Sequence, residues 1–314
     1  MYYKLSDSER NNRIVWASVR ATLERFRFKY KRGGFKTKSK YRLFEKLLLL
    51  FGLMLKVIGV YRKGVQNAMN INIENIEVES YSLPQEFNGF RILFLSDLHI
   101  DAIDGFEDVI IKKIEGLSYD LCVITGDFRM DTEGSFRKIL PAVKKIVDAV
   151  KAPFGVLAVL GNHDTYLMVE PFEAMGIRCL INETVFLTKN KARITVAGTD
   201  DTYYFYTDKA MDVLEQDAGG FKICLSHTSE LCDVAARNNF KLYLCGHTHG
   251  GQICLPGGKP VISHQKSSAL KVKGLWKEGE MTGYTSRGVG VSGIPLRFNC
   301  SPEVTIVTLK QKNR

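Results

Sequence analysis

Gly161-Asn162-His163-Asp164 follows directly on the apolar run 155–160, and the junction between the two decides how the chain is expected to fold. An apolar run of about four to eight residues bounded by turn residues is typical of a buried strand. The polar cluster therefore begins where a strand ends. The same arrangement recurs, with Asp97-Leu98-His99 after 91–96, Gly126-Asp127 after 121–125, Ser226-His227 after 222–225 and Gly246-His247-Thr248-His249 after 242–245.

Segments with helical periodicity separate several of these runs. They span 106–117, 136–150, 209–216 and 229–237, and further strands are predicted at 71–78, 194–198 and 303–309. Strands that alternate with helices predict an α/β domain, here residues 64–314. In open α/β sheets, the loops at the carboxyl ends of the strands build the site. The polar clusters are therefore expected to meet in one crevice.

The clusters contain side chains suited to metal binding. Two carboxylates, one amide and four imidazoles can act as ligands, and one further histidine, His163, stands beside Asp164. Such a set can hold two divalent cations and leave a histidine for proton transfer. A carboxylate can bridge ions about 3.5–4 Å apart, and four imidazoles exclude a pure magnesium or calcium cage.

The series D-x-H, G-D, G-N-H-D, H and G-H-x-H, in this order, resembles the calcineurin-like metallophosphoesterase superfamily over roughly residues 90–250. The stretch Gly-His-Thr-His-Gly-Gly-Gln at 246–252 and residues 281–309 resemble its bacterial membrane-associated phosphodiesterase branch, which includes UDP-2,3-diacylglucosamine pyrophosphatase-like proteins. The resemblance implies a four-layered αββα sandwich with a dinuclear metal centre at one edge of the sheets. It also implies a hydrolase that acts on phosphodiester or pyrophosphate bonds.

The resemblance implies a role for each motif position. One metal is assigned to Asp97, His99 and His249, the other to Asn162, His227 and His247, and Asp127 bridges both. Manganese is the expected metal, with iron and zinc as alternatives. Two such cations would lower the pKa of a water enough to supply hydroxide near neutral pH. His163 would protonate the leaving oxygen, and Asp164 would orient His163 or, alternatively, cap a helix.

The positive charge of the chain is concentrated at one end. Residues 1–42 hold thirteen Lys and Arg against three Asp and Glu, so the whole formal excess of +10 lies there. The neutral remainder is not a general polyanion binder, and no specific nucleic-acid partner is expected. Nothing in the sequence indicates a particular protein partner.

Residues 1–63 are predicted to form a helical membrane-associating segment. Within 8–31, one apolar stripe recurs at helical spacing and consists of Val15, Val19, Leu23, Phe26 and Tyr30. A line of arginines lies near it and consists of Arg13, Arg20 and Arg27. The stripe would enter the membrane interface and the arginines would meet anionic headgroups. The alternative is a helix packed on the domain, with its arginines in solvent.

A second apolar stretch, 47–61, is interrupted by Lys56. A spanning helix needs about 20 predominantly apolar residues, so a second interfacial helix is predicted, with Lys46, Arg62 and Lys63 also reaching headgroups. A single-span anchor is the alternative. The expected location is therefore peripheral, on the cytoplasmic face of the inner membrane.

These features favour a lipid-linked or nucleotide-type phosphoester as the substrate. The specific hypothesis is hydrolysis of UDP-2,3-diacylglucosamine to UMP and a lipid monophosphate, a step of lipid A synthesis. The alternatives are a general phosphodiesterase, a nuclease and a non-catalytic metal-binding scaffold. Because all expected ligands and His163 are present, activity is favoured over the scaffold.

Several other residues carry weaker expectations. The seven cysteines are odd in number, and Cys122, Cys224 and Cys245 lie inside apolar runs, so buried reduced thiols are predicted. No CxxC pair supports a structural zinc ribbon. Asp101, Asp200 and Asp201 are expected in solvated turns, and His264 on the surface. Residues 256–280 are expected to form an irregular loop over the site, in which Trp276 packs.

Overall fold

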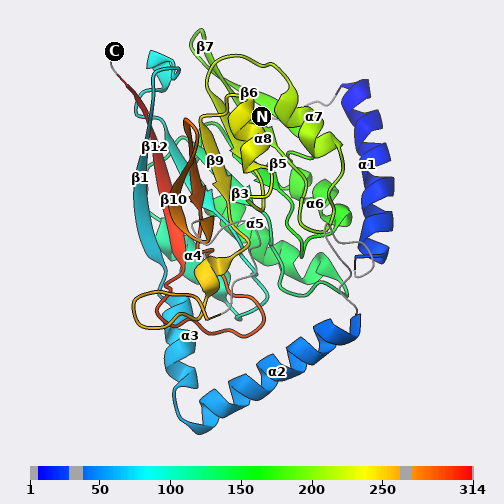
Figure 1. Ribbon diagram of the computed structural model, residues 1–314, viewed down its shortest axis with the longest axis vertical. Coiled ribbons are helices and arrows are strands. Elements are labelled where there is room, and N and C mark those ends of the chain that lie inside the picture. The colour runs from blue at the N-terminus through cyan, green and yellow to red at the C-terminus, as the bar shows by residue number, and fades with distance from the viewer. Residues whose placement is uncertain (1–5, 28–37, 262–270, 313–314) are drawn as a thin grey trace.

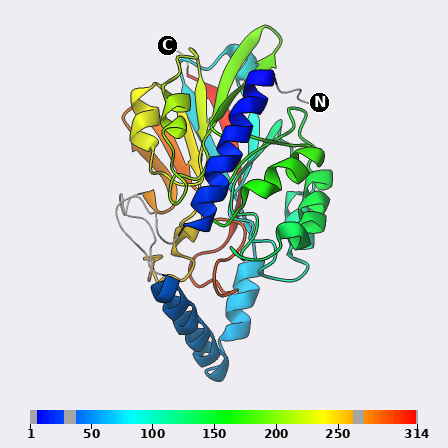
Figure 2. The ribbon, with the colours of Figure 1, turned by 90° about the vertical axis from the view of Figure 1, so that its right-hand side faces the viewer.

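The computed structural model describes residues 6–27, 38–261 and 271–312, and its core is a pair of facing six-stranded sheets (Figures 1 and 2). The first sheet has the order β1 (Asn72–Ser80), β12 (Glu303–Gln311), β2 (Arg91–Leu95), β3 (Leu121–Thr125), β4 (Val156–Val159) and β5 (Ile177–Cys179). The second has the order β10 (Gly274–Glu278), β11 (Met281–Thr285), β9 (Leu242–Cys245), β8 (Lys222–Leu225), β7 (Ala192–Gly198) and β6 (Glu183–Lys189).

Helices cover the outer face of each sheet. The first sheet is covered by α4 (Phe106–Ile114), α5 (Leu140–Ala149) and α6 (Val169–Ala174), and the second by α7 (Lys209–Glu215) and α8 (Cys232–Arg237). Short 3₁₀ turns lie at η1 (Gln85–Phe87), η2 (Phe136–Ile139), η3 (Tyr166–Met168) and η4 (His249–Gly251). Figure 2 shows the helix layers on either side of the sheets.

The alternation of side chains along the strands explains the four layers. In β2, Leu93 and Leu95 face a core shared with α4 and α5, whereas Ile92 and Phe94 face the core between the two sheets. Successive residues of a strand point to opposite faces, so a strand that is apolar throughout must be covered on both sides. The predicted αββα sandwich is confirmed.

The central strands were predicted from the sequence, whereas several of the outer elements were not. The apolar runs before the polar clusters form β2, β3, β4, β8 and β9. The sequence interpretation missed β5, β6, β11 and α3 (Tyr61–Met69), and it placed β10 inside a region expected to be irregular. Trp276 on β10 is buried against Tyr243 and donates its indole N–H to Thr285 Oγ1 at 2.9 Å, so the packing role is confirmed.

β12 lies between two strands from the beginning of the domain. It pairs in parallel with β1, from Asn72↔Glu303 to Ser80↔Gln311, and antiparallel with β2. The other neighbours of the first sheet, from β2 to β5, are all parallel. Their carboxyl ends therefore lie on one edge, as the sequence analysis expected.

Helix α1 (Asp7–Arg25) packs on the sandwich with its charged face inward. It lies on the side where β5 and β6 end the two sheets (Figure 2). Arg13 pairs with Glu173 and Glu183, and buried Arg20 pairs with Asp200. A helix was predicted over 8–31, whereas α1 ends at Arg25. It packs on the domain, as the alternative interpretation had it, but the expectation that these arginines meet headgroups or solvent is wrong. Tyr30 lies outside the described residues.

Helix α2 (Lys38–Val57) projects from one end of the molecule and is joined to the body through α3 (Figure 1). One side of α2 packs through Leu55 onto a small cluster with Ile294 and Leu296. The other side exposes an apolar stripe at helical spacing: Leu43, Leu47, Leu50, Met54 and Val57, between 47% and 79% exposed. Among the described residues, no helix is both long and apolar enough to cross a bilayer.

Candidate metal centre

The polar clusters follow the carboxyl ends of five strands from both sheets, and the backbone there turns sharply. Asp97, Asp127, His247 and His249 all have φ between 51° and 71°, in the left-handed region that non-glycine residues rarely adopt. Such strained residues gather at functional sites, where the surrounding structure holds them in place. The backbone conformation of these turns therefore indicates a functional site.

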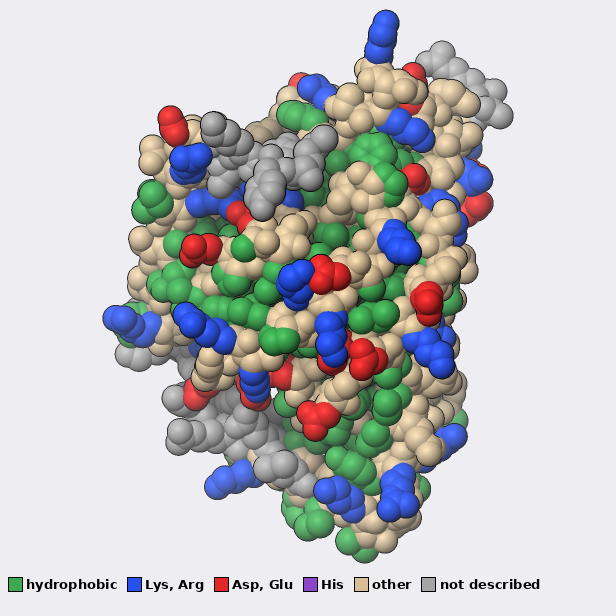
Figure 3. Space-filling view, turned by 180° about the vertical axis from the view of Figure 1, so that it is seen from behind, with side chains coloured by type: hydrophobic (Ala, Val, Ile, Leu, Met, Phe, Trp, Pro, Cys, Tyr) green, Lys and Arg blue, Asp and Glu red, His purple; other side chains and the backbone are tan. Residues whose placement is uncertain are grey.

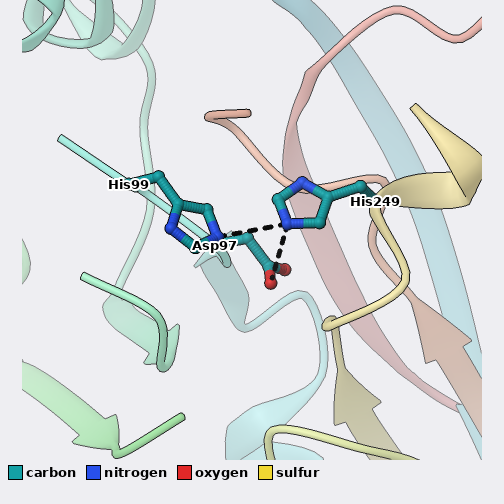
Figure 4. A group of neighbouring side chains, drawn as sticks. All are labelled: Asp97, His99 and His249. Carbon is teal, nitrogen blue, oxygen red and sulfur yellow. Dashed lines mark hydrogen bonds and ion pairs between the residues drawn. The ribbon is translucent and has the colours of Figure 1, made fainter. Parts of the chain in front are cut away.

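One group of side chains combines Asp97, His99 and His249 (Figure 4). The Nε2 atoms of the two histidines lie 3.2 Å apart, and His249 Nε2 lies 3.6 Å from Asp97 Oδ1. His99 Nδ1 donates to the Arg129 carbonyl at 2.9 Å, which leaves the Nε2 lone pair facing the group. A ring nitrogen fixed in this way is the usual arrangement of a metal-binding histidine.

A second group combines Asp127, His227 and His247, with Asn162 beside them. His227 Nδ1 donates to the Thr125 carbonyl at 2.8 Å. Its Nε2 lies 3.0 Å from Asn162 Oδ1 and 3.2 Å from His247 Nδ1. A backbone carbonyl thus fixes the orientation of the His227 ring as well. Two further atoms that can bind a metal, Asn162 Oδ1 and His247 Nδ1, lie close to its Nε2.

Asp127 joins the two groups. Its Oδ2 atom lies 3.6 Å from His99 Nε2 and 3.3 Å from His227 Nε2. All seven side chains predicted as metal ligands are therefore brought to one place, in two sets that share a carboxylate. Oxygen and imidazole nitrogen donors within this range suit manganese, iron or zinc, so the residues present fit two divalent cations.

The electrostatics of the buried groups favour cations. Burial lowers the pKa of His99 to about 3, which keeps this imidazole in the neutral, ligating form. Burial also opposes a charge on His227, but the Asp127 carboxylate outweighs it and raises the pKa of His227 to about 10. The Asp127 carboxylate thus attracts positive charge to the position of His227 Nε2, as it would attract a cation.

His163 lies at the rim of the centre. Its Nδ1 contacts the Met130 carbonyl at 2.5 Å, and its Nε2 lies 4.0 Å from Asp127 Oδ2. The side chain is 14% exposed, whereas His99 and His227 are completely buried. His163, like the half-buried His247, is therefore a member of the cluster that an entering molecule could reach.

Asp164 makes contacts that differ from the expected ones. Its carboxylate accepts hydrogen bonds from the backbone N–H groups of Asp127, Phe128 and Gly161, at 2.8–2.9 Å. The Met130 carbonyl, and not Asp164, holds the His163 ring. The expected orientation of His163 by Asp164 and the alternative helix cap are both wrong. Asp164 instead ties the Asp127 turn to the Gly161 turn.

Three aspartates expected in solvated turns are not solvated. Asp200 and Asp201 are buried, and Asp101 accepts a hydrogen bond from Met130 N at 2.6 Å. Asp200 is paired with Arg20, a partner far away in the sequence. His264 lies outside the described residues, so its expected surface position stays a prediction.

The sequence analysis also missed Arg297, which is completely buried. Its guanidinium donates to the His249 carbonyl at 3.2 Å and to the carbonyls of Arg287 and Gly290 at 2.6 Å. It thus holds the backbone of one candidate ligand against the segment after β11. The signal was the arginine in Gly-Ile-Pro-Leu-Arg-Phe, a polar residue in an otherwise apolar stretch.

Known proteins resemble this chain over the region that contains the candidate ligands. The model of the calcineurin-like phosphoesterase family matches residues 90–251. The uncharacterized metallophosphoesterase YkuE of Bacillus subtilis is 32% identical, over 75% of this chain and 84% of its own length. The phosphodiesterase YaeI of Escherichia coli is 31% identical, over 70% of this chain and 82% of its own length.

A vertebrate relative matches as well. A transmembrane protein with metallophosphoesterase domain from Danio rerio is 28% identical, over 84% of this chain and 62% of its own length. The family model covers the part of the chain that contains both side-chain groups around Asp127. The chain belongs to the calcineurin-like phosphoesterase family and is a hydrolase that acts on phosphoester bonds.

Proposed function

We propose that the protein hydrolyses a phosphodiester or pyrophosphate bond at a dinuclear metal centre. Asp97, His99 and His249 would hold one cation, Asn162, His227 and His247 the other, and Asp127 both. The observation that carries the proposal is the convergence of His99 Nε2 and His227 Nε2 on one Asp127 oxygen, at 3.6 and 3.3 Å.

The proposed cations are two Mn²⁺ ions, with iron or zinc as alternatives. When bound, they would supply hydroxide near neutral pH and neutralise charge on the phosphoryl oxygens. The protein side chains fix where this happens. Carbonyl groups orient the rings of His99 and His227, and the Asp164 carboxylate fixes the turn of Asp127 through its backbone N–H.

His163 is proposed as the proton donor to the leaving oxygen. The Met130 carbonyl accepts from Nδ1, so the form that acts as the acid is the imidazolium, which carries a second proton on Nε2, on the side that faces Asp127. Transfer of that proton leaves the neutral ring, with Nδ1–H still bonded to the carbonyl. The partial exposure of this side chain allows a substrate oxygen to approach it. General acid catalysis of this kind contributes roughly 10²–10⁴-fold to a rate.

The proposed substrate is a lipid-linked phosphoester at a membrane surface, on the cytoplasmic face of the inner membrane. The support is the exposed apolar stripe of α2, Leu43 to Val57, with Lys46, Lys56, Arg62 and Lys63 also exposed nearby. Figure 3 shows hydrophobic and Lys or Arg side chains together at the lower end of the molecule, where α2 and α3 lie in Figure 1. Apolar and basic surfaces side by side suit an anionic interface.

The specific substrate hypothesis is UDP-2,3-diacylglucosamine, cleaved to UMP and a lipid monophosphate. A general phosphodiesterase is the second candidate, favoured by the name of the YaeI relative. The membrane proposal rests on α2, because Arg13 and Arg20 of α1 are paired with the protein body and do not reach headgroups.

Product analysis tests the proposal. Purified protein with Mn²⁺ should hydrolyse bis-p-nitrophenyl phosphate, and with anionic vesicles it should release UMP and lipid monophosphate from UDP-2,3-diacylglucosamine. Asp127→Asn should abolish both activities, whereas the exposed Asp148→Asn should change neither. Hydrolysis of the small diester without lipid product would replace the lipid hypothesis with the general phosphodiesterase. Full activity of Asp127→Asn would refute the shared-carboxylate centre.

A further inference from the structure

Helix α1 lies outside residues 90–251, which match the family model, yet it contacts the loop that carries two of the proposed site residues. The contacts come from two side chains one helical turn apart, Arg20 and Glu24. They reach the loop 161–166, which follows β4 and contains Asn162 and His163.

Arg20 is a buried charge with a specific set of partners. It is 1% exposed and pairs with Asp200 at 2.5 Å. Its Nη2 donates to the carbonyls of Gly161 at 3.2 Å and Asp164 at 3.1 Å, and its guanidinium lies 3.5 Å over the ring of Phe205. The two carbonyls flank Asn162 and His163, so one guanidinium holds both ends of this dipeptide.

Glu24 continues the contact along the same loop. It pairs with Arg20 at 3.0 Å. Its carboxylate also accepts hydrogen bonds from the hydroxyl of Thr165 at 2.7 Å and from the backbone N–H of Tyr166 at 2.9 Å. From residue 161 to residue 166, the outer side of the loop is thus bonded to α1.

The inner side of the same loop is bonded to the catalytic body. Asp164 accepts from the Asp127 backbone, and Arg129 Nε donates to the His163 carbonyl at 2.8 Å. The loop is therefore held between α1 and the Asp127 turn. Residues that orient a metal ligand from outside typically change metal affinity or activity when they are replaced.

We propose that Arg20 and Glu24 are positioning residues, which hold loop 161–166 so that Asn162 Oδ1 and His163 Nε2 face the centre. The inference rests on the proposed roles of Asn162 and His163. On this inference, α1 belongs functionally to the catalytic domain, although the sequence analysis assigned it to a separate membrane-associating segment. Removal of residues 1–63 would then impair turnover as well as membrane binding.

A purely stabilising role for α1 is the competing explanation, and Arg13 offers a matched control for it. Arg13 anchors the same helix through Glu173, Glu183 and the Cys179 carbonyl, with N–O distances of 2.6–3.0 Å. These partners do not belong to loop 161–166. Loss of Arg13 should weaken the attachment of α1 to Glu173 and Glu183, whereas Arg20 and Glu24 keep their own bonds to the loop.

The experiment compares Arg20→Gln, Glu24→Ala and Arg13→Gln with the wild-type protein. Mn²⁺ binding is followed by calorimetry, turnover with bis-p-nitrophenyl phosphate, and unfolding by Tm. Arg20→Gln and Glu24→Ala should weaken binding of one of the two Mn²⁺ ions by roughly 10-fold and lower kcat by about 10–100-fold, with KM changed much less. Arg13→Gln should lower Tm and leave the Mn²⁺ affinity and kcat of the folded protein unchanged.

Equal Mn²⁺ affinity and kcat in all four proteins would overturn the inference, even if their Tm values differ. If Arg20→Gln does not fold, Glu24→Ala decides, because the Glu24 side chain is 20% exposed and its loss is easier to accommodate. Glu24→Gln keeps two hydrogen-bonding atoms and should recover most of the loss. A wild-type protein that binds no Mn²⁺ would instead refute the proposed centre, and with it the basis of the inference.

Discussion

Gly161→Ala is a demanding test of the proposed centre, because the change adds one methyl group where there is no room for it. A Cβ at this position would lie 2.2 Å from Asp127 Oδ1 and 2.5 Å from Asp127 N. Ordinary contact begins at 3.4 Å. The backbone of one of the two turns must therefore retreat by about 1 Å, and this moves the carboxylate that both proposed cations would share.

The size of that displacement sets the expected effect. A misplacement of about 1 Å at a reacting centre can cost roughly 10²-fold in rate. We therefore expect kcat with bis-p-nitrophenyl phosphate to fall about 100-fold in Gly161→Ala, with weaker Mn²⁺ binding in calorimetry. Gly52→Ala is the matched control, because a Cβ there approaches nothing closer than 3.9 Å. It should keep wild-type activity.

Two outcomes would refute this reasoning. Wild-type turnover and Mn²⁺ affinity in Gly161→Ala would show that the Asp127 turn can move without harm, and that Asp127 is not the shared ligand. An equal loss of activity in Gly52→Ala would show that the assay responds to any added methyl group. Circular dichroism of both variants would establish that each is folded.

Three further predictions concern the metals, the proton donor and the membrane. Removal of divalent ions with EDTA should abolish hydrolysis, and Mn²⁺ should restore it; activity that persists in EDTA would contradict the metal centre. His163→Gln should keep Mn²⁺ binding in calorimetry and lose about 10²–10⁴-fold in turnover of esters with poor leaving groups, but much less with p-nitrophenyl esters; loss of a bound metal would identify His163 as a ligand instead. Leu50→Glu combined with Val57→Glu should weaken co-sedimentation with anionic vesicles by roughly 100-fold or more, since each buried side chain contributes about 1.5–3 kcal/mol. The same change at the exposed Ile14 of α1 should have no effect, and equal losses would place the membrane contact elsewhere.

The central strands and the meeting of the polar clusters could be predicted from the sequence, because both depend on local pattern. A short apolar run followed by Asp97 or Asp127 indicates a buried strand and the loop at its end. Parallel strands then bring those loops to one edge. The buried cysteines were predicted for a similar reason, and all seven are free and buried in the structure.

The orientation of α1 could not be predicted in this way. Helix α1 has one apolar face and one basic face, and a helix that binds a membrane surface has the same pattern. Which face points inward depends on Glu173, Glu183 and Asp200, which lie about 160 to 180 residues away. The ion pair between Arg20 and Asp200 also explains why Asp200 was wrongly expected in a solvated turn. The two residues are 180 positions apart, so the sequence around Asp200 gives no sign of its partner.

The position of β12 has a consequence for how the chain is assembled. Its nine residues separate β1 from β2, and the partners Asn72 and Glu303 are 231 positions apart in the chain. Such non-local pairing makes folding slow. During synthesis, α2 leaves the ribosome long before residues 303–311 exist to complete the first sheet. Until the last strand arrives, the edge of β2 is open, so the incomplete chain exposes an unpaired strand that favours aggregation.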